Sequence, residues 1–461
     1  MDAPARQDLS SPPPWVTSRS RATETGTKLL APFTVAAVGD LICPQPVARS
    51  DPRFSHFAGL LRAADIGFGN MESSLVDFAT FPHAIAGTAA PFAMGEALRG
   101  MGLDMLSRAN NHTFDCGVLG MVSTDEALDR LGLTHAGTGT CLQEARAARF
   151  RETPKGRVGL VSFYSVADTG HFGPTYARTL ATPRDGRMGG MPGVNPLRLT
   201  QYNIVSPAHL DALRGIAAGT YGERPGAWEE AGGRPPRFRF YDQWYQAGSD
   251  PGSIRYEMDP GDRAGILSAI SNGKIYSDFL IATIHSHQAT RFDPQGAFGK
   301  VKGLKEPLEH FAPDFLQAVA REAIDAGADM FIAHGVHALA GVEIYKGRPI
   351  FYGMSNFIFQ CGLQMGAGYD VLKNWNVKSE LEHPDCHVSV LAESVFDGGV
   401  LREIRLHPAD LGGGRRPLSQ MGIPLVPERS LADGILANLQ DYSRPYGTEI
   451  AISGGIGTIR N

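Results

Sequence analysis

Short apolar segments, each followed by a polar residue, alternate with helical patterns along this chain of 461 residues. Residues 33–39 read FTVAAVG and are followed by Asp40, and residues 278–284 and 329–333 repeat the style as DFLIATI and DMFIA. Continuous apolar runs of this length are typical of parallel strands that are buried on both faces. Strands that alternate with helices imply βα units and a sheet covered on both sides. The pattern therefore predicts an α/β fold.

The C-terminal part of the chain changes character. The stretch VEIYKGRPIFYG is expected to form a hairpin around Lys346 and Gly347, and a second hairpin is expected to turn at residues 397–399. The stretch SLADGILANLQDYS is expected to form a late helix. We therefore expect antiparallel additions to the α/β fold.

Two other segments depart from the alternation. Residues 1–30 are rich in Pro, Ser and Thr and are predicted to be a disordered or loosely attached tail. Residues 165–259 are rich in Gly, Pro, Arg and aromatic residues, which predicts a loop-rich insertion. We expect a single domain over residues 31–461 that contains this insertion as a possible lid.

Composition excludes several classes of protein. Hydrophobic residues make up 43% and charged residues 20%, as in ordinary globular proteins, and the net charge is −5. Such a charge provides no positive field for nucleic acid or for an anionic membrane. The five cysteines show no CxxC spacing, which argues against a disulfide framework and a thiolate zinc cluster. No signal-peptide core and no run of about 18 apolar residues is present, so we expect a cytoplasmic protein without a transmembrane segment.

Side chains that can ligate a metal follow five of the predicted strands. They are Asp40, then Asn70 and Glu72, then Asn110, Asn111 and His112, then His285 and His287, and finally His334 and His337. Ligands in open α/β sheets gather beyond the carboxyl ends of the strands. Each residue alone has a structural alternative, such as a turn or a helix cap, and Asp115 is expected to be such a cap. Agreement between five strand ends favours a shared site.

Several of these stretches resemble one known family. They are AAVGDLI, ADIGFGNMESSL, RANNHTFDCGVLGMVSTDEAL, IATIHSHQ, AHGVHALAGVEIYKGRPIFYGMSNFIFQ and, near the C-terminus, RPYGTEI. They resemble the CapA-type proteins of poly-γ-glutamate capsule synthesis, a branch of the calcineurin-like metallophosphoesterases. The resemblance covers about residues 33–455, apart from the insertion. It implies a four-layer αββα sandwich of metallophosphoesterase type with a metal site at one edge.

The resemblance implies a site with two divalent metal ions. Mixed carboxylate, amide and imidazole donors suit Mn, Zn or Fe. The implied ligands are Asp40, Glu72, Asn111, His285, His334 and His337, and the implied general acid is His112. Asn70, His287 and Asn356 are expected to contact the substrate or to support the ligands. The superfamily has Asp-x-His after its first strand, where this chain has Asp40-Leu41-Ile42, and Glu72 is the expected substitute for the missing imidazole.

The resemblance leaves the reaction open. A hydroxide held by two metal ions would attack a phosphoester, which the fold favours, or a γ-glutamyl or peptide amide, which the link to polyglutamate favours. The substrate is thus expected to be a small molecule, a peptide or polyglutamate, attacked by hydrolysis or transfer. The alternatives are a non-hydrolytic assembly factor for capsule or polyglutamate synthesis and a metal-assisted peptide epimerase.

The insertion offers side chains for selectivity. Arg237, Arg239, Tyr241, Trp244 and Tyr245 can pair with or stack on an anionic substrate. We expect the segment to fold over the metal pocket as a partial lid. The alternative is that these side chains form a satellite core under a long loop.

Overall fold

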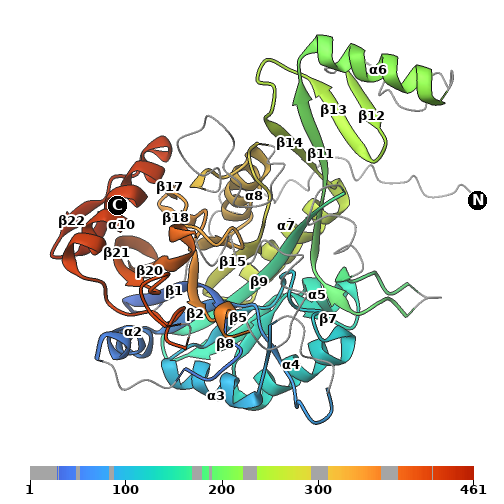
Figure 1. The fold of residues 1–461 in the computed structure, drawn as a ribbon. Coiled ribbons are helices and arrows are strands. Elements are labelled where there is room, and N and C mark those ends of the chain that lie inside the picture. Colours follow the sequence, from blue (N-terminus) through green and yellow to red (C-terminus); the bar gives the residue numbers. More distant parts are fainter. Residues whose placement is uncertain are drawn as a thin grey trace, which may run out of the picture.

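The computed structural model describes residues 29, 31–47, 52–81, 88–168, 179–185, 189–221, 236–291, 310–364, 383–417 and 419–460. Over these residues the protein is mixed α/β, with most of its strands in two large sheets (Figure 1). The tail predicted for residues 1–30 lies almost wholly outside the described residues. No helix in the described part of the chain is long and apolar enough to cross a membrane.

The first sheet has nine strands among the described residues. Their order is β22-β23-β21-β20-β1-β2-β5-β6, and β19 also pairs with β1. The bounds are β1 Phe33–Ile42, β2 Ile66–Met71, β5 Met105–Ser107, β6 Thr134–Ala136, β19 Asn356–Phe359, β20 Val388–Asp397, β21 Val400–Asp410, β22 Ala451–Ser453 and β23 Ile456–Arg460. Strands β1, β2, β5 and β6 are parallel, as the alternating pattern predicts. The predicted hairpin at residues 397–399 is confirmed as the turn between β20 and β21.

The second sheet has ten strands in the described part of the chain, in the order β12-β13-β11-β9-β15-β16-β18-β17, with β14 on β11 and β8 on β9. The bounds are β8 Arg149–Thr153, β9 Gly156–Ala167, β11 Pro196–Val205, β12 Arg237–Phe240, β13 Gln243–Ala247, β14 Ile254–Met258, β15 Phe279–His285, β16 Met330–His334, β17 Val342–Tyr345 and β18 Arg348–Phe351. Strands β9, β15 and β16 are parallel. The predicted hairpin at Lys346 and Gly347 is confirmed between β17 and β18. Two short pairs are the remaining strands among the described residues, β3 Ser74–Leu75 with β4 Ala89–Ala90 and β7 Thr138–Gly139 with β10 Gly193–Val194.

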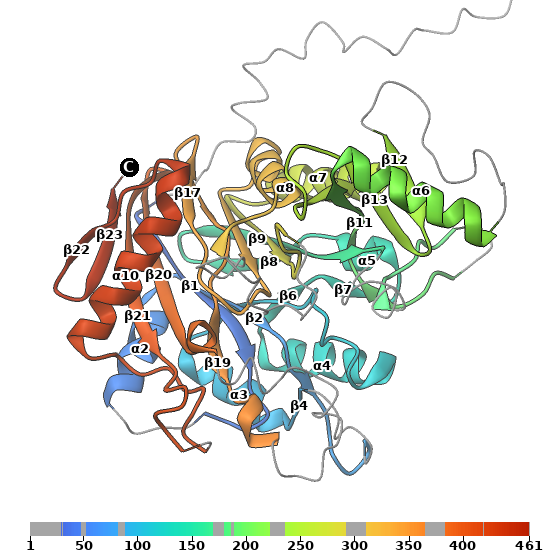
Figure 2. The ribbon, with the colours of Figure 1, turned by 45° about the horizontal axis from the view of Figure 1, so that its top comes forward.

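Several helices cover the outer faces of the two sheets, whereas α6 extends from the main body and α10 contributes to the apolar cluster between the sheets (Figure 2). Their bounds are α2 Pro52–Ala63, α3 Phe92–Met101, α4 Gly117–Leu131, α5 Leu142–Arg146, α6 Pro207–Tyr221, α7 Pro260–Ile275, α8 Asp314–Asp325 and α10 Arg429–Ser443. Apolar residues of α2, α3 and α4 pack on the first sheet, and those of α7 and α8 pack on the second. A third apolar cluster lies between the sheets, where the rings of Phe33 and Phe279 are 5.4 Å apart. Helix α10 confirms the late helix predicted from the sequence.

Strand β1 shows why the apolar runs are continuous. Val35 and Ala37 join the cluster between the two sheets, whereas Ala36 and Val38 join the cluster under α2 and α3. Because successive side chains of a strand point to opposite faces, a strand buried on both faces needs apolar residues at every position. Gly39 ends this run because the backbone of Ser355, directly before β19, lies close to it. A Cβ at this position would lie 1.9 Å from the Ser355 carbonyl oxygen.

The prediction of a loop-rich insertion over residues 165–259 is wrong for the part of it that the structure describes. This part contains α6 and strands β10 to β14, and β11 pairs with β9, β13 and β14 within the second sheet. Figure 1 shows α6, β12 and β13 extending from the main body at the end of β11. The short strands alternate with Gly- and Pro-rich stretches, and pairing between distant residues stabilises them. The local sequence pattern of these strands is therefore weak, which is why they were not predicted.

Candidate metal centre

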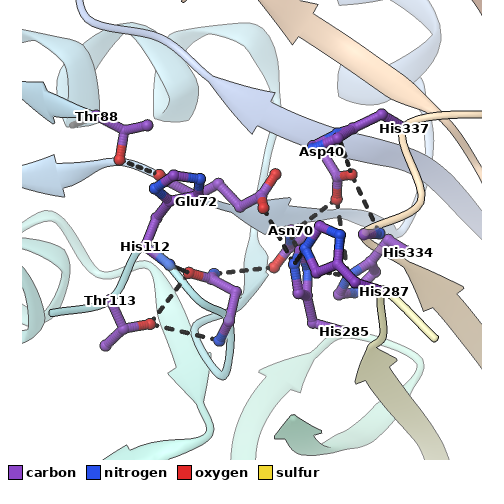
Figure 3. A network of polar contacts seen from close by, with 12 residues as sticks. Asp40, Asn70, Glu72, Thr88, His112, Thr113, His285, His287, His334 and His337 are labelled. Atoms are coloured by element: carbon purple, nitrogen blue, oxygen red, sulfur yellow. Dashed lines mark hydrogen bonds and ion pairs between the residues drawn. The ribbon is translucent and has the colours of Figure 1, made fainter. Parts of the chain in front are cut away.

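Asp40 lies at the carboxyl end of β1 and is completely buried. It is in register with Asn70 of β2, whose Nδ2 donates to Asp40 Oδ1 at 2.8 Å. The backbone N–H of Gly335 donates to Asp40 Oδ2 at 3.2 Å, across from the second sheet. The carboxyl edges of the two sheets therefore meet at this carboxylate (Figure 3).

Three histidines approach Asp40 from the second sheet. His285 and His334 are opposite each other at the ends of β15 and β16, with their Nδ1 atoms 3.2 Å apart. His334 Nδ1 lies 3.7 Å from Asp40 Oδ1, and its Nε2 lies 2.8 Å from the Thr283 hydroxyl. His337 follows β16 with a φ of 53°, and its Nδ1 is 3.4 Å from Asp40 Oδ2. The left-handed backbone at His337 turns its ring towards β1 (Figure 3).

Burial sets the ionisation of these imidazoles. It lowers the pKa of His285 well below the ordinary value. It also lowers the pKa of His334 to about 4, although the Asp40 carboxylate opposes this shift. Both rings are therefore neutral near pH 7, which is the form that binds a metal ion.

Glu72 follows β2 and has no exposed surface. Burial, with the nearby Asp40 charge, raises the pKa of Glu72 to about 8. Neither of its carboxylate oxygens accepts a hydrogen bond from the described residues, and the nearest ion-pair atom is His285 Nε2 at 3.1 Å from Oε1. The buried Oδ1 of Asn111 likewise accepts no hydrogen bond from the described residues. Buried oxygens without donors are costly, and a cation would stabilise all three.

The donor atoms form three overlapping groups, in each of which the atoms lie within 4.8 Å of one another. The groups are Asp40 with His285 and His334, Glu72 with His285 and His287, and Asp40 with Glu72 and His337. Carboxylate and imidazole donors in this mixture suit Zn, Mn or Fe better than Ca or Mg. The residues present therefore fit a divalent metal centre.

His112 lies beside Glu72 (Figure 3) and is oriented by Asp115. Its Nδ1 is 2.8 Å from Asp115 Oδ2, and that carboxylate also accepts from the Thr88 backbone N–H at 3.0 Å. Burial disfavours the charged ring, but Asp115 and Glu72 outweigh it and raise the pKa of His112 to about 9. The expected capping role of Asp115 is wrong, because Cys116 occupies the N-cap of α4, without a side-chain cap. The i,i+3 spacing of His112 and Asp115 is the sequence signal for this contact.

The three supporting residues also lie in the network. Asn70 Nδ2 is 3.1 Å from His285 Nδ1, and His287 Nε2 is 2.9 Å from His285 Nε2. Asn356 Oδ1 is 2.8 Å from His337 Nδ1, while its Nδ2 donates to the Cys386 carbonyl at 3.0 Å. Asn110 is among the polar residues at the predicted strand ends but not among the implied ligands, and its Nδ2 donates to Asn70 Oδ1 at 3.2 Å and to the Met71 carbonyl at 2.8 Å.

The cationic and aromatic residues of the insertion contact one another. Arg237 is buried, pairs with Glu257 and lies 4.0 Å from the centre of the Tyr202 ring. Trp244 packs at 6.0 Å from the same ring, and Arg239 lies 5.8 Å from the Trp244 ring. These contacts form a satellite core in the part of the segment that the structure describes. The lid stays a prediction.

Residues 34–298 and 307–361 match the family described as "Bacterial capsule synthesis protein PGA_cap". The chain belongs to this family. The matched residues include every candidate ligand from Asp40 to His337 and also His112. The resemblance to CapA-type proteins predicted from the sequence is therefore confirmed.

Full-length relatives of this PGA_cap protein occur in Sinorhizobium fredii NGR234. Two proteins, "Uncharacterized protein y4sH" and "Uncharacterized protein y4uA", are each 36% identical over 467 residues, which is 95% of either chain. "PGA biosynthesis protein CapA" of Bacillus subtilis is 27% identical over 154 residues, or 32% of this chain and 36% of that protein. A solved structure of a hypothetical protein from Thermus thermophilus aligns at 11% identity and a TM-score of 0.36, over 82% of this chain and 99% of that one.

Proposed function

We propose that this PGA_cap protein is a metal-dependent hydrolase or transferase with two divalent ions in the site around Asp40. The observation that carries the proposal is the set of buried, unpartnered oxygens of Glu72 and Asn111 beside neutral imidazoles. The two face-to-face sheets with outer helices support a four-layer sandwich of metallophosphoesterase type. In this arrangement the site lies at the edge where the strands of both sheets end.

The ligands would divide between two ion positions. Asp40 faces groups on both sides and would bridge, with His285 and His334 on one side and His337 and Glu72 on the other. Asn111 would add its amide oxygen. Two divalent ions bound there would supply an activated water and would polarise the bond that is cleaved. Mn, Zn or Fe is the expected metal.

His112 acts as the proton donor to the leaving group. Its Nδ1 is engaged by Asp115, which leaves Nε2 as the atom that can hold and deliver a proton. Asp115 is itself fixed by the Thr88 backbone, so the ring orientation is set before substrate binds. A ring held in this way protonates a leaving oxygen or nitrogen without a large rearrangement.

A phosphoester is the first candidate substrate, because the proposed sandwich and the mixed-donor ligand set are those of the metallophosphoesterases. A γ-glutamyl or peptide amide is the second candidate, because relatives are named for capsule and PGA biosynthesis. A non-hydrolytic assembly role or peptide epimerisation would leave His112 without a leaving group to protonate. The segment over residues 165–259 would then contribute to selectivity in either hydrolytic case, as a partial lid.

The test begins with metal analysis of purified protein. After treatment with a chelator, the protein is reloaded with Mn, Zn or Fe and is screened against phosphomonoesters, phosphodiesters and γ-glutamyl peptides. Turnover that needs metal and that falls in H112N supports the proposal. Metal binding without any turnover would favour the assembly role, whereas racemised peptide without cleavage would favour the epimerase.

A further inference from the structure

The position of Glu72 is set by its backbone, because its carboxylate has no hydrogen-bond donor among the described residues. Three successive carbonyls here accept bonds from distant side chains. Arg108 Nη1 donates to the Met71 carbonyl at 3.3 Å and to the Ser73 carbonyl at 3.2 Å. The Thr88 hydroxyl donates to the Glu72 carbonyl at 2.5 Å. The backbone on both sides of Glu72 is therefore held by one guanidinium group.

Arg108 is an unusual residue to find in this place. It follows β5 directly and its side chain is 0% exposed. Its Nε is 3.5 Å from Asp125 Oδ1 on α4, and its Nη2 has no hydrogen-bond partner among the described residues. A buried guanidinium with one long carboxylate contact is poorly compensated, since removal of a charge from water costs more than such a contact returns. Stability alone does not explain an arginine at this position.

We propose that Arg108 is a positioning residue that holds Glu72 in the metal centre, an inference that rests on the proposed function. Oxygen atoms of the Asp40 and Glu72 carboxylates lie within 4.8 Å of each other, so two negative charges at these positions repel. The Nη1 group of Arg108 resists this repulsion by donating to both carbonyls that flank Glu72. Asn110 also donates to the Met71 carbonyl, but its contact with this backbone is on that side alone. Arg108 thus acts on metal affinity through Glu72.

The test is a double-mutant cycle between Arg108 and Glu72. The affinity of chelator-treated full-length protein for Mn²⁺ is measured by calorimetry in wild type, R108M, E72Q and R108M/E72Q. Loss of a group that orients a ligand weakens metal binding by about 10–100-fold, which is the loss expected for R108M. In the E72Q background, R108M should cause little further loss because the residue that it positions can no longer ligate as a carboxylate.

Lys274 provides a matched control. It is also a buried cation, 1% exposed, and it pairs with Asp329 at 2.7 Å at the opposite end of β16 from His334. K274M should lower the melting temperature as R108M does, yet it should leave Mn²⁺ affinity within about two-fold of wild type. R108K keeps the charge, but its ammonium group ends one bond short of the position of Nη1, so a smaller loss of affinity is expected than for R108M.

The outcomes separate the two claims. If wild type does not bind Mn²⁺, or if E72Q binds it as tightly as wild type does, the proposed metal ligation by Glu72 is wrong. If E72Q weakens binding but R108M does not, or if the two losses add fully, Arg108 has no positioning role. If R108M fails to fold, the Mn²⁺ affinity of R108K is the test, and an affinity equal to that of wild type would overturn the inference.

Discussion

At the carboxyl edge of the first sheet the buried polar groups are mainly carboxylates and amides, whereas at the edge of the second sheet they are imidazoles. The second-sheet rings of His285 and His334 are neutral near pH 7 because burial lowers their pKa values. On the first-sheet side the pKa of Glu72 is raised to about 8, because the carboxyl is buried and a second carboxylate, Asp40, lies close by. The edge of the second sheet thus offers imidazole lone pairs that can bind a metal ion. The edge of the first sheet holds two carboxyl groups close together, and a metal ion would stabilise their negative charge.

This difference teaches that neither sheet holds the site alone. Asp40 connects the two edges, because its Oδ1 accepts from Asn70 of the first sheet and its Oδ2 accepts from Gly335 of the second. The carboxylates would repel each other without a cation between them. The imidazoles bring no charge to offset that repulsion. A metal centre would offset the repulsion between the carboxylates of one edge and would bind the neutral imidazoles of the other.

The largest effect is expected from D40N. The amide keeps the size of Asp40 but removes the charge that both ion positions share. Metal content should fall close to zero and turnover should fall to background. Elemental analysis of the purified variant, with circular dichroism as a check of folding, measures this. A D40N protein that retains two ions per chain would show that Asp40 does not bridge the two edges.

The second prediction distinguishes a proton donor, His112, from a metal ligand, His337. H112N should retain normal metal content while turnover falls by about 10²–10⁴-fold, because a general acid contributes this much. H337N serves as the contrast and should lower metal content. Equal metal loss in both variants would make His112 a ligand. Normal metal content in H337N would remove His337 from the ligand set.

A smaller effect concerns the pH dependence of stability in the metal-free protein. The folded pKa of Glu72, about 8, lies above its ordinary value, so the folded state binds a proton that the unfolded state has lost. The free energy of unfolding should therefore fall as the pH rises towards 8, by at most about 1.4 kcal/mol per unit from this group. His112, with a raised pKa of about 9, contributes in the same direction.

Urea unfolding of chelator-treated protein at pH 7.5 and pH 8 measures this slope, in a range above the ordinary pKa of histidine where neutral His285 and His334 contribute little. E72Q should flatten the slope but leave the part that arises from the contact of His112 with Asp115. A slope that is unchanged in E72Q would mean that Glu72 is already ionised in the metal-free protein.

The smallest effect is expected at the insertion. Val205 and Ala247 are neighbours on the parallel strands β11 and β13, so a short glycine linker can join them in place of residues 206–246, and β11 keeps its pairing with β14. If the segment acts as a lid, this variant should keep its metal ions and should gain activity on small generic esters relative to the substrate of the intact protein. If the relative activity is unchanged, the segment is not a lid, and its side chains only form the satellite core.

The strand ends could be predicted from the sequence because each apolar run is closed by a polar residue, as FTVAAVG is by Asp40. Parallel strands then bring these residues to one edge, and no distant contact needs to be known. Parts of the site that depend on pairing between distant segments were missed. Arg108 and Met71 are 37 residues apart, and nothing in the local pattern joins them. The ordered structure of the insertion was missed for the same reason, because it depends on contacts such as the ion pair between Arg237 and Glu257.

The central claim is that groups from both sheet edges bind metal ions together. The most direct measurement is anomalous diffraction from crystals of the Mn²⁺-loaded protein. The account predicts two manganese peaks, about 3.5–4 Å apart, with Asp40 between them, His285 and His334 on one and His337 and Glu72 on the other. A single peak held by the imidazoles alone, with Glu72 pointing away and protonated, would contradict it.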